Sequence, residues 1–268
     1  MKSNSYETIT VDHEGDLARV FLARPEVRNA FNETMIGELR HAFLALGDLP
    51  SLRAVVLGGQ GDVFCAGADL EWMRRAQGKD EADNLEDARA LAHMYRTIDE
   101  CPVPVVGRLQ KAAFGGALGL LAACDIVVAE AGTRLAFTEV RLGILPAVIS
   151  SFVVAKIGPS QARRYFITGE TFTAEQAPPG LVHEVVPAGQ LDFKVNELIA
   201  GLREAAPGAV REVKALLRQT AGLSRDQALE FCARTIARVR VGSEAQAGLA
   251  AFLEKTRAPW RPASGMES

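Results

Sequence analysis

The chain has 268 residues, of which 48% are hydrophobic and 24% are charged, a composition typical of folded globular domains. Thirty Lys and Arg residues against 33 Asp and Glu residues give a formal net charge of -3. This balance lacks the basic excess that binding to a nucleic-acid backbone requires. The composition excludes disordered, collagenous and coiled-coil classes. Because of the net charge, nucleic acid is not expected as a partner.

The spacing of the cysteines and of the apolar runs bears on metals and membranes. The cysteines are Cys65, Cys101, Cys124 and Cys232. They form no CxxC pair and no zinc-site spacing, so free thiols and no bound metal are expected. Residues 1–16 lack the apolar run of a secretory signal, and the longest nearly apolar run, 112–124, is too short to span a bilayer. We therefore expect a cytoplasmic protein without a membrane partner.

The apolar patterning predicts an α/β fold. Two β-branched runs, 6–12 and 17–22, flank a turn and predict an antiparallel hairpin. A helix is expected from its N-cap residue Asn32 to a stop at Gly47. The elements expected next are strands at 54–59, 103–107 and 126–129 and helices at 81–100 and 116–124. This alternation is typical of a mixed or parallel sheet covered by helices.

After residue 186 the pattern is helical throughout. The expected helices are 191–205, 209–220, 225–241 and 244–255, the last capped by Ser243. We place an α/β core at residues 1–200 and a C-terminal helical section at residues 201–268. The tail 261–268 is expected to be disordered.

Two turns rich in small residues are the strongest signals of a functional site. The segments FCAGADL (64–70) and AAFGGALGLLAACD (112–125) each follow a predicted strand and run into a helix. Small residues allow a ligand to approach the backbone, and two facing turns could hold a developing oxyanion with their N–H groups. Each turn by itself fits close packing of a helix on the sheet equally well. The sequence contains no GxxxxGK[ST], GxSxG or HExxH motif, so nucleotide and serine hydrolysis lack support.

Seven segments spread over the chain identify a family. They are ARPEVRNAFN (23–32), FCAGADL, AAFGGALGL, CDIVVA (124–129), FTEVRLGILP (137–146), GLVHEVV (180–186) and AFLEKTRAPW (251–260). In this order they resemble the crotonase family, also called the enoyl-CoA hydratase/isomerase family. The resemblance implies a crotonase-like spiral of ββα units followed by C-terminal helices that form a homotrimer or a dimer of trimers. It also implies an acyl-CoA thioester as substrate and no prosthetic group.

The resemblance also implies which residues form the site. By motif position, the N–H groups of Ala68 and Gly116 would bind the thioester oxygen, and Glu139 would be the catalytic carboxylate. The implied coenzyme A contacts are Arg28, Ala66, Ala68, Asp69 and Leu70, with Phe252 and Lys255 reaching a coenzyme A in a neighbouring subunit. The basic groups suit an anionic cofactor. The alternatives are that Arg28 and Lys255 are merely solvated and that Phe252 belongs to the core.

One catalytic group of the family's hydratases is missing. Those enzymes carry two glutamates, and the second stands where this chain has Gly119, one helical turn after Gly116. A side chain at this position is expected to face the same ligand space. A single carboxylate would also suit a double-bond isomerase, because one base can remove a proton and return it at the other end. An isomerase using Glu139 is therefore the first alternative.

A closer resemblance favours a hydratase. AAFGGALGL, TEVRLG and PAVIS (146–150) look like the bacterial methylglutaconyl-CoA and isohexenylglutaconyl-CoA hydratases. This implies hydration of a branched enoyl-CoA with a distal carboxylate, and Glu139 would handle both the water and the proton. A basic residue near the acyl end could bind that carboxylate, and the candidates are Arg74, Arg75 and Arg141.

Two departures from the family pattern affect the turns. Gln110 and Lys111 replace a pair of small residues, and a positive φ at Lys111 would cost about 1 kcal/mol. Pro178 and Pro179 replace the end of a short helix and predict an extended turn. These changes and Gly119 leave open an acyl-CoA-binding protein without turnover, or an RNA-binding family member, although the net charge of -3 disfavours RNA.

Overall fold

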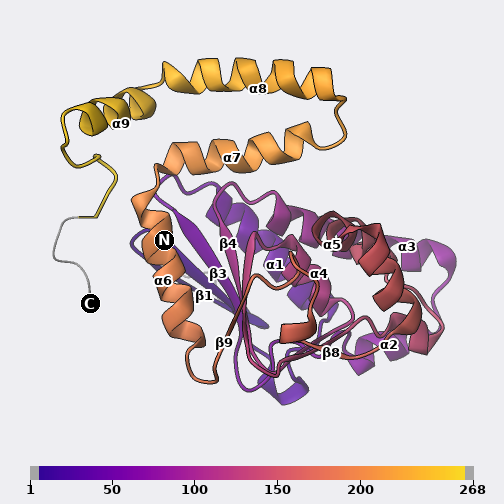
Figure 1. Ribbon diagram of the computed structural model, residues 1–268. Helices are drawn as coiled ribbons and strands as arrows, with labels where there is room; N and C mark the ends of the chain where they lie inside the picture. The colour runs from indigo at the N-terminus through magenta and orange to yellow at the C-terminus, as the bar shows by residue number, and fades with distance from the viewer. Residues whose placement is uncertain (1–5, 263–268) are drawn as a thin grey trace. The chain divides into compact units, whose positions relative to one another are not determined.

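The structure is a computed structural model that describes residues 6–262 (Figure 1). Residues up to 101 together with 105–195 form one compact unit, and residues 102–104 together with those from 196 onward form a second. From residue 263 on, the tail for which disorder was predicted lies outside the described residues. Within residues 6–262, no helix is both long and apolar enough to cross a membrane.

The first unit is built on a mixed sheet with the strand order β1-β2-β3-β4-β6-β9. Strands β1 (Ile9–Glu14) and β2 (Leu17–Leu22) are antiparallel, which confirms the predicted hairpin, and the other neighbouring pairs are parallel. The parallel strands are β3 (Ala54–Gly59), β4 (Val105–Leu109), β6 (Ile126–Glu130) and β9 (Glu184–Val186). All of β3 is buried, as expected for a parallel strand covered on both faces. The predicted α/β class is correct.

A second, three-stranded sheet positions the candidate site. It contains β5 (Ala112–Phe114), β7 (Arg134–Ala136) and β8 (Phe172–Thr173). Strands β5 and β7 are parallel, and Phe114 is opposite Ala136. Because parallel strands end at the same edge of a sheet, the turn after β5 and the segment after β7 leave side by side. The N–H of Gly115 donates to the carbonyl of Ala136 at 2.9 Å, and this hydrogen bond joins the segments that follow β5 and β7.

Helices cover the strands of the first unit. They are α1 (Glu33–Gly47), α2 (Leu70–Ala76), α3 (Glu81–Asp99), α4 (Ala117–Ala123) and α5 (Ala147–Thr168). Asn32 caps α1 as predicted, by accepting a hydrogen bond from the N–H of Met35. Gly47, predicted as the stop, is instead the last helical residue, and Asp48 is the C-cap. Helix α4 packs against both α3 and α5 (Figure 1).

The sequence patterning missed helix α5. Its apolar periodicity is interrupted at Gly158, which has non-helical angles of φ 71° and ψ 163°, and Pro159 follows inside the helix. Two shorter helical segments therefore join across a kink, which hides the period of a single long helix. Further along, Pro178 and Pro179 lie in an extended turn, as predicted, and Leu181 N–H donates to the Pro178 carbonyl at 3.1 Å.

The predicted run of C-terminal helices is also present. The helices are α6 (Leu191–Glu204), α7 (Pro207–Thr220), α8 (Arg225–Arg240) and α9 (Ser243–Leu253). Ser224 caps α8 in a capping box with Gln227. The cap predicted for the last helix is wrong, because Gly242 is the N-cap residue and Ser243 is already the first helical residue. In the second unit, the buried Lys214 donates to the Val103 carbonyl at 3.0 Å.

Candidate active site

The two small-residue turns lie directly against each other. Cys65 N–H donates to the Ala112 carbonyl at 3.3 Å, and Phe114 N–H donates to the Cys65 carbonyl at 3.2 Å. Gly67 has a φ of 99°, and a Cβ added there would lie 2.9 Å from the Phe114 carbonyl oxygen. Only glycine fits this close approach, so the FCAGADL segment owes its contact with the second turn to Gly67.

Each turn presents one N–H group without an acceptor in the part of the chain that the structure describes. Neither the Ala68 N–H nor the Gly116 N–H has a hydrogen-bond acceptor among residues 6–262. Ala68 is exposed and Gly116 is partly exposed, so both N–H groups belong to residues that a ligand can reach. An unpaired backbone N–H group needs water or a ligand atom as its acceptor. An oxyanion site requires two such donors that converge on one ligand atom.

A buried polar network holds the Ala68 turn. The Phe31 N–H donates to the Gly67 carbonyl and the Asp69 N–H donates to the Phe31 carbonyl, both at 2.8 Å. The side chain of Asn29, fully buried, donates to the carbonyls of Gln60 and Val63, each at 2.8 Å. These contacts fix the backbone on both sides of Ala68 to the strand-helix framework.

Asp69 belongs to the same network. Its carboxylate lies 2.8 Å from Arg24 Nη1 and accepts the N–H groups of Glu71 and Trp72, which begins helix α2. Burial would raise the pKa of Asp69, but the hydrogen bonds from Arg24, Trp72 and Glu71 outweigh burial and hold the pKa below its ordinary value. Asp69 is thus an ionised cap and ion-pair partner beside the Ala68 turn.

Glu139 lies next to the second turn. It is the first residue of a short 3-10 helix, Glu139–Leu142, that follows β7. A Cβ added to Gly115 would lie 3.5 Å from Glu139 Oε1, which places this carboxylate against the turn that carries Gly116. Glu139 Oε2 is buried and has no hydrogen-bond partner among the described residues. Burial raises the pKa of Glu139 above its ordinary value, because the ionised form loses hydration.

Two side chains occupy the space beside Gly119. A Cβ at Gly119 would lie 2.4 Å from Ile149 Cγ2 and 2.7 Å from Tyr95 Cζ. In this chain a side chain at position 119 would therefore meet Tyr95 and Ile149. Sequence reasoning missed Tyr95, because it lies in the buried stripe of α3 with Met94 and Ile98 and resembles an ordinary core residue.

The residues for which coenzyme A contacts were predicted fall into two groups. Arg28, Ala66, Ala68, Asp69 and Leu70 lie together in the first unit, where the Arg28 carbonyl accepts the Ala66 N–H at 2.9 Å. Leu70 is 70% exposed. Phe252 and Lys255 lie in the second unit, at the end of α9, and Phe252 is 80% exposed. The alternative that Phe252 is a core residue is therefore wrong.

The candidate arginines have different surroundings. Arg74 pairs with Glu71, and Arg75 lies 2.8 Å from a Glu33 oxygen, both in exposed ion pairs. Arg141 Nε would lie 3.3 Å from a Cβ added to Gly169, so this side chain packs on the end of α5.

Lys111 has the positive φ that was considered from the sequence. Its φ is 56°, and its side chain is exposed. Lys111 directly precedes strand β5, and its carbonyl accepts the Arg134 N–H at 2.9 Å, so the left-handed residue is part of the scaffold below the Gly116 turn.

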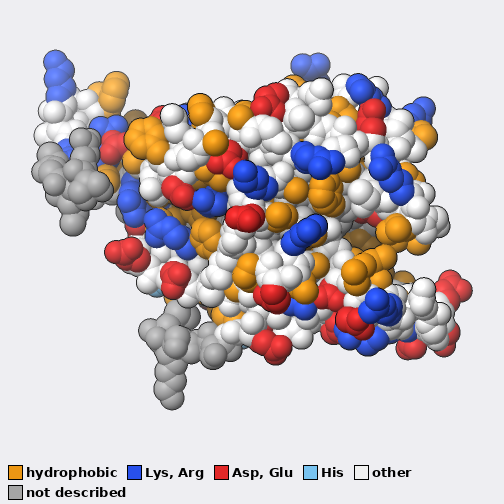
Figure 2. All heavy atoms as spheres, turned by 90° about the horizontal axis from the view of Figure 1, so that it is seen from below, with side chains coloured by type: hydrophobic (Ala, Val, Ile, Leu, Met, Phe, Trp, Pro, Cys, Tyr) orange, Lys and Arg blue, Asp and Glu red, His pale blue; other side chains and the backbone are white. Residues whose placement is uncertain are grey.

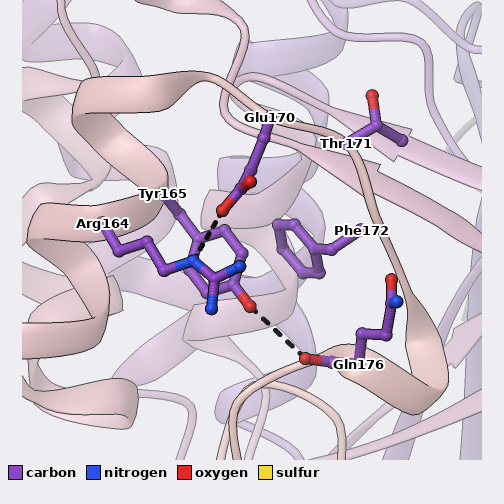
Figure 3. Close-up of a pocket in the computed structure, with 6 residues that line it drawn as sticks. All are labelled: Arg164, Tyr165, Glu170, Thr171, Phe172 and Gln176. Carbon is purple, nitrogen blue, oxygen red and sulfur yellow. Dashed lines mark hydrogen bonds and ion pairs between the residues drawn. The ribbon is translucent and has the colours of Figure 1, made fainter.

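A separate pocket of about 420 Å³ contains none of these residues (Figure 3). It is lined by Arg164, Tyr165, Glu170, Thr171, Phe172 and Gln176. The Arg164 guanidinium pairs with Glu170 at 2.7 Å, and the Tyr165 hydroxyl lies 3.4 Å from the Gln176 carbonyl oxygen (Figure 3). Its two charged side chains, Arg164 and Glu170, pair with each other.

The surface and the metal-ligating residues add two observations. On the face drawn in Figure 2, acidic and basic side chains are interspersed, with hydrophobic side chains between them.

Among residues 6–262, no group of three or more His, Cys, Asp or Glu side chains is placed to hold a metal ion.

Comparison with known proteins shows the family of the chain. The enoyl-CoA hydratase/isomerase family matches residues 12–263, and the chain belongs to this family. A solved enoyl-CoA hydratase from Shewanella pealeana superimposes with a TM-score of 0.92 and 35% identity, covering 96% of this chain and 97% of that one. The fold is therefore that of the crotonases.

Two curated relatives are similar over most of the chain. A putative enoyl-CoA hydratase from Thermus thermophilus is 32% identical over 243 residues, covering 90% of this chain and 96% of that protein. The enoyl-CoA hydratase ACTT6 from Alternaria alternata is 33% identical over 261 residues, covering 94% of this chain and 82% of that protein. Both relatives are described as enoyl-CoA hydratases, the first of them as a putative one.

Proposed function

We propose that this protein adds water across the double bond of an enoyl-CoA thioester, with Glu139 as its single catalytic carboxylate. The observation that carries the proposal is the position of Glu139. Its carboxylate is partly buried, one of its oxygens has no partner among residues 6–262, and it lies against the turn whose Gly116 N–H has no acceptor among the same residues. The N–H groups of Ala68 and Gly116 form the oxyanion hole in this proposal. No prosthetic group takes part, and coenzyme A enters as part of the substrate.

The proposed reaction moves one proton through one carboxylate. Ionised Glu139 takes a proton from water, and the oxygen of that water bonds to the β-carbon of the enoyl group. The electron pair of the double bond moves to the thioester oxygen, where the N–H groups of Ala68 and Gly116 stabilise the enolate. Protonated Glu139 then returns a proton to the α-carbon. The raised pKa of Glu139 suits both steps, because it brings the proton affinity of the carboxylate closer to neutral pH.

We propose a branched acyl group with a distal carboxylate, of the 3-methylglutaconyl type, as the substrate. The support is the resemblance of AAFGGALGL, TEVRLG and PAVIS to hydratases of such thioesters. Arg141, two residues after Glu139, is the basic residue nearest to it in sequence. Arg74 and Arg75 remain candidates, because exposed ion pairs such as theirs are worth less than about 1 kcal/mol and can be exchanged for a substrate. A homotrimer or dimer of trimers belongs to the same proposal.

The test compares two thioesters that differ in the distal carboxylate. Purified protein is mixed with 3-methylglutaconyl-CoA and with 3-methylcrotonyl-CoA, and loss of the conjugated thioester absorbance is followed. We expect hydration of the first only, loss of turnover in Glu139→Ala, and retention of turnover in Glu170→Ala, whose carboxylate pairs with Arg164 at the separate pocket.

Three other outcomes would contradict parts of the proposal. Equal hydration of both thioesters would exclude a distal-carboxylate pocket. Migration of the double bond without water uptake would establish the isomerase alternative, for which a single carboxylate is sufficient. Binding of the thioesters without any reaction would establish a binding protein.

A further inference from the structure

The side chain of Tyr95 contacts the Gly116 turn of the candidate active site. It comes from helix α3, is 0% exposed, and donates its hydroxyl proton to the Gly116 carbonyl at 2.7 Å. A Cβ added to Gly116 would lie 2.9 Å from the same hydroxyl oxygen. The phenol therefore touches the residue that offers an unpaired N–H to the ligand.

The Gly116 turn needs such a contact. Gly115 has a φ of 54°, and two consecutive glycines leave the backbone with more conformational freedom than any other pair of residues. The Gly116 carbonyl accepts the Tyr95 hydroxyl and also the Gly119 N–H, at 2.9 Å, which is a local bond of the first helical turn. Among the described residues, the hydrogen bond from Tyr95 is the one that ties Gly116 to a different element of the fold. It restrains the peptide plane that follows Gly116, and thereby limits how the backbone at Gly116 can turn.

The ring of Tyr95 has a second consequence. It fills the space beside Gly119, where a Cβ would lie 2.7 Å from Cζ and 2.8 Å from Cε1. The ring centroid lies 5.9 Å from that of Phe152 on α5, so aromatic packing holds the phenol in place. This side of the site is thus closed by a rigid side chain that is anchored on α3 and α5.

The electrostatic surroundings keep the phenol a donor. Burial raises the pKa of Tyr95 well above its ordinary value, and the negative charges of Cys65 and Glu139, when ionised, raise it further. Burial also raises the pKa of Cys65 to about 12, so that thiol is neutral. A neutral phenol can donate to Gly116 through the whole catalytic cycle, while the Glu139 carboxylate takes up and returns its proton.

We propose that Tyr95 is a positioning residue of this active site, which orients the Gly116 N–H toward the thioester oxygen through its hydrogen bond to the Gly116 carbonyl. It acts through Gly116 and touches no reacting atom. The inference rests on the proposed function, since it requires that Gly116 binds the thioester oxygen. The expected role is stabilisation of the enolate rather than binding of coenzyme A.

The test removes the hydroxyl and keeps the ring. Tyr95→Phe preserves the packing beside Gly119, and Tyr165→Phe is the matched control. Tyr165 is also buried, at 4% exposure, and its hydroxyl likewise faces a backbone carbonyl, that of Gln176 at 3.4 Å. The probe is acetoacetyl-CoA, a thioester whose enolate absorbs in the near ultraviolet. The measured quantities are the affinity, the enolate absorbance at saturation, and kcat and KM for the enoyl-CoA that the wild-type protein hydrates.

Wild-type protein and Tyr165→Phe should bind the probe and increase its enolate fraction. Tyr95→Phe should bind it with an affinity within about threefold of wild type but with a clearly smaller enolate fraction, and should lose about tenfold in kcat with little change in KM. An unchanged enolate fraction and kcat in Tyr95→Phe would overturn the inference, as would equal losses in both variants. If the wild-type protein itself binds no acyl-CoA, the proposed function fails and this inference fails with it, which is a different result from failure of Tyr95 alone.

Discussion

Arg24 and Asp69 form an ion pair of 2.8 Å directly beside the Ala68 turn, with only 18% and 8% of their side chains exposed. The same carboxylate begins helix α2 by accepting hydrogen bonds from two backbone N–H groups. Asp69 therefore holds the Ala68 turn whether or not it also contacts coenzyme A. A residue chosen from a binding motif is at the same time part of the scaffold that shapes the site.

Replacement of Asp69 should therefore destabilise the fold. Asp69→Ala removes the carboxylate that pairs with Arg24, which keeps only its hydrogen bond to the Ala30 carbonyl, and leaves α2 without its cap. The free energy of unfolding should fall by about 3 kcal/mol. Asp69→Asn should lose less, because asparagine caps helices well. The control is Glu71→Gln, which breaks the exposed pair with Arg74 and should cost less than about 0.5 kcal/mol. Urea unfolding of the three variants provides the comparison, and equal losses for Asp69→Ala and Glu71→Gln would contradict the prediction.

Glu139→Gln should stabilise the protein while it strongly reduces turnover. The variant removes a partly buried charge whose burial raises its pKa, so the fold should gain about 0.5–1 kcal/mol at neutral pH. kcat should fall by roughly a hundredfold or more, because the base is lost. The gain in stability should vanish at a pH low enough to protonate wild-type Glu139. Thermal melts at neutral and acidic pH test this sign, and a less stable variant at neutral pH would contradict it.

The pH dependence of catalysis should report the environment of Glu139. Only the ionised carboxylate can accept the proton of water, so kcat/KM should fall as the pH drops through the pKa of Glu139. Because burial raises that pKa, the fall should begin at a higher pH than an exposed glutamate, with its pKa of about 4.3, would produce. A pH profile of kcat/KM, with circular dichroism at each pH to monitor folding, tests this. An acid limb at or below the exposed value would show that Glu139 is not desolvated in solution.

Gly119 should not tolerate a side chain. In Gly119→Ala, the new methyl group would meet Ile149 at 2.4 Å and the Tyr95 ring at 2.7 Å, which should cost about 1–3 kcal/mol through overpacking. Gly37→Ala is the control, since Gly37 is an exposed residue of α1 with nothing within 4 Å of the added Cβ. That variant should gain about 0.5–1 kcal/mol from the better helix propensity of alanine. The two changes in the free energy of unfolding, measured by chemical denaturation, should therefore have opposite signs. A stabilised Gly119→Ala would contradict the close packing around Gly119.

Replacement of Lys111 by glycine should stabilise the fold. Its φ of 56° lies in the left-handed region, so Lys111→Gly should raise the free energy of unfolding by about 1 kcal/mol. The control is Arg40→Gly, an exposed substitution inside helix α1, which should lower the free energy of unfolding by about 1 kcal/mol. Chemical denaturation of both variants measures the two signs. A loss of stability in Lys111→Gly would mean that the lysine side chain makes a compensating contact.

The order of strands and helices could be predicted from local patterns. β-branched runs around a turn predicted the hairpin that β1 and β2 form, and Asn32 predicted the start of α1 through its own side-chain hydrogen bond. These features depend on neighbours in the sequence, so their signals are local. Helix α5 could not be predicted in this way, because Gly158 and Pro159 interrupt its local pattern, and its packing against α3 and α4 is not visible in the sequence.

Part of the site was determined by the sequence itself. The small residues of the two turns and the glutamate of FTEVRLG are local motifs, and the resemblance that they carry names the family to which the chain belongs. Each of these signals needs only a few consecutive residues.

The tertiary structure alone decided what surrounds those motifs. Parallel pairing of β5 with β7 brings Glu139 to the Gly116 turn, and packing of α3 against α4 places the Tyr95 phenol on the Gly116 carbonyl. It also fills the space beside Gly119 that local helical geometry assigned to the ligand. The physical reason is that these contacts join residues distant in the chain. Their partners are chosen by how whole elements pack, and no pattern within one element contains that information.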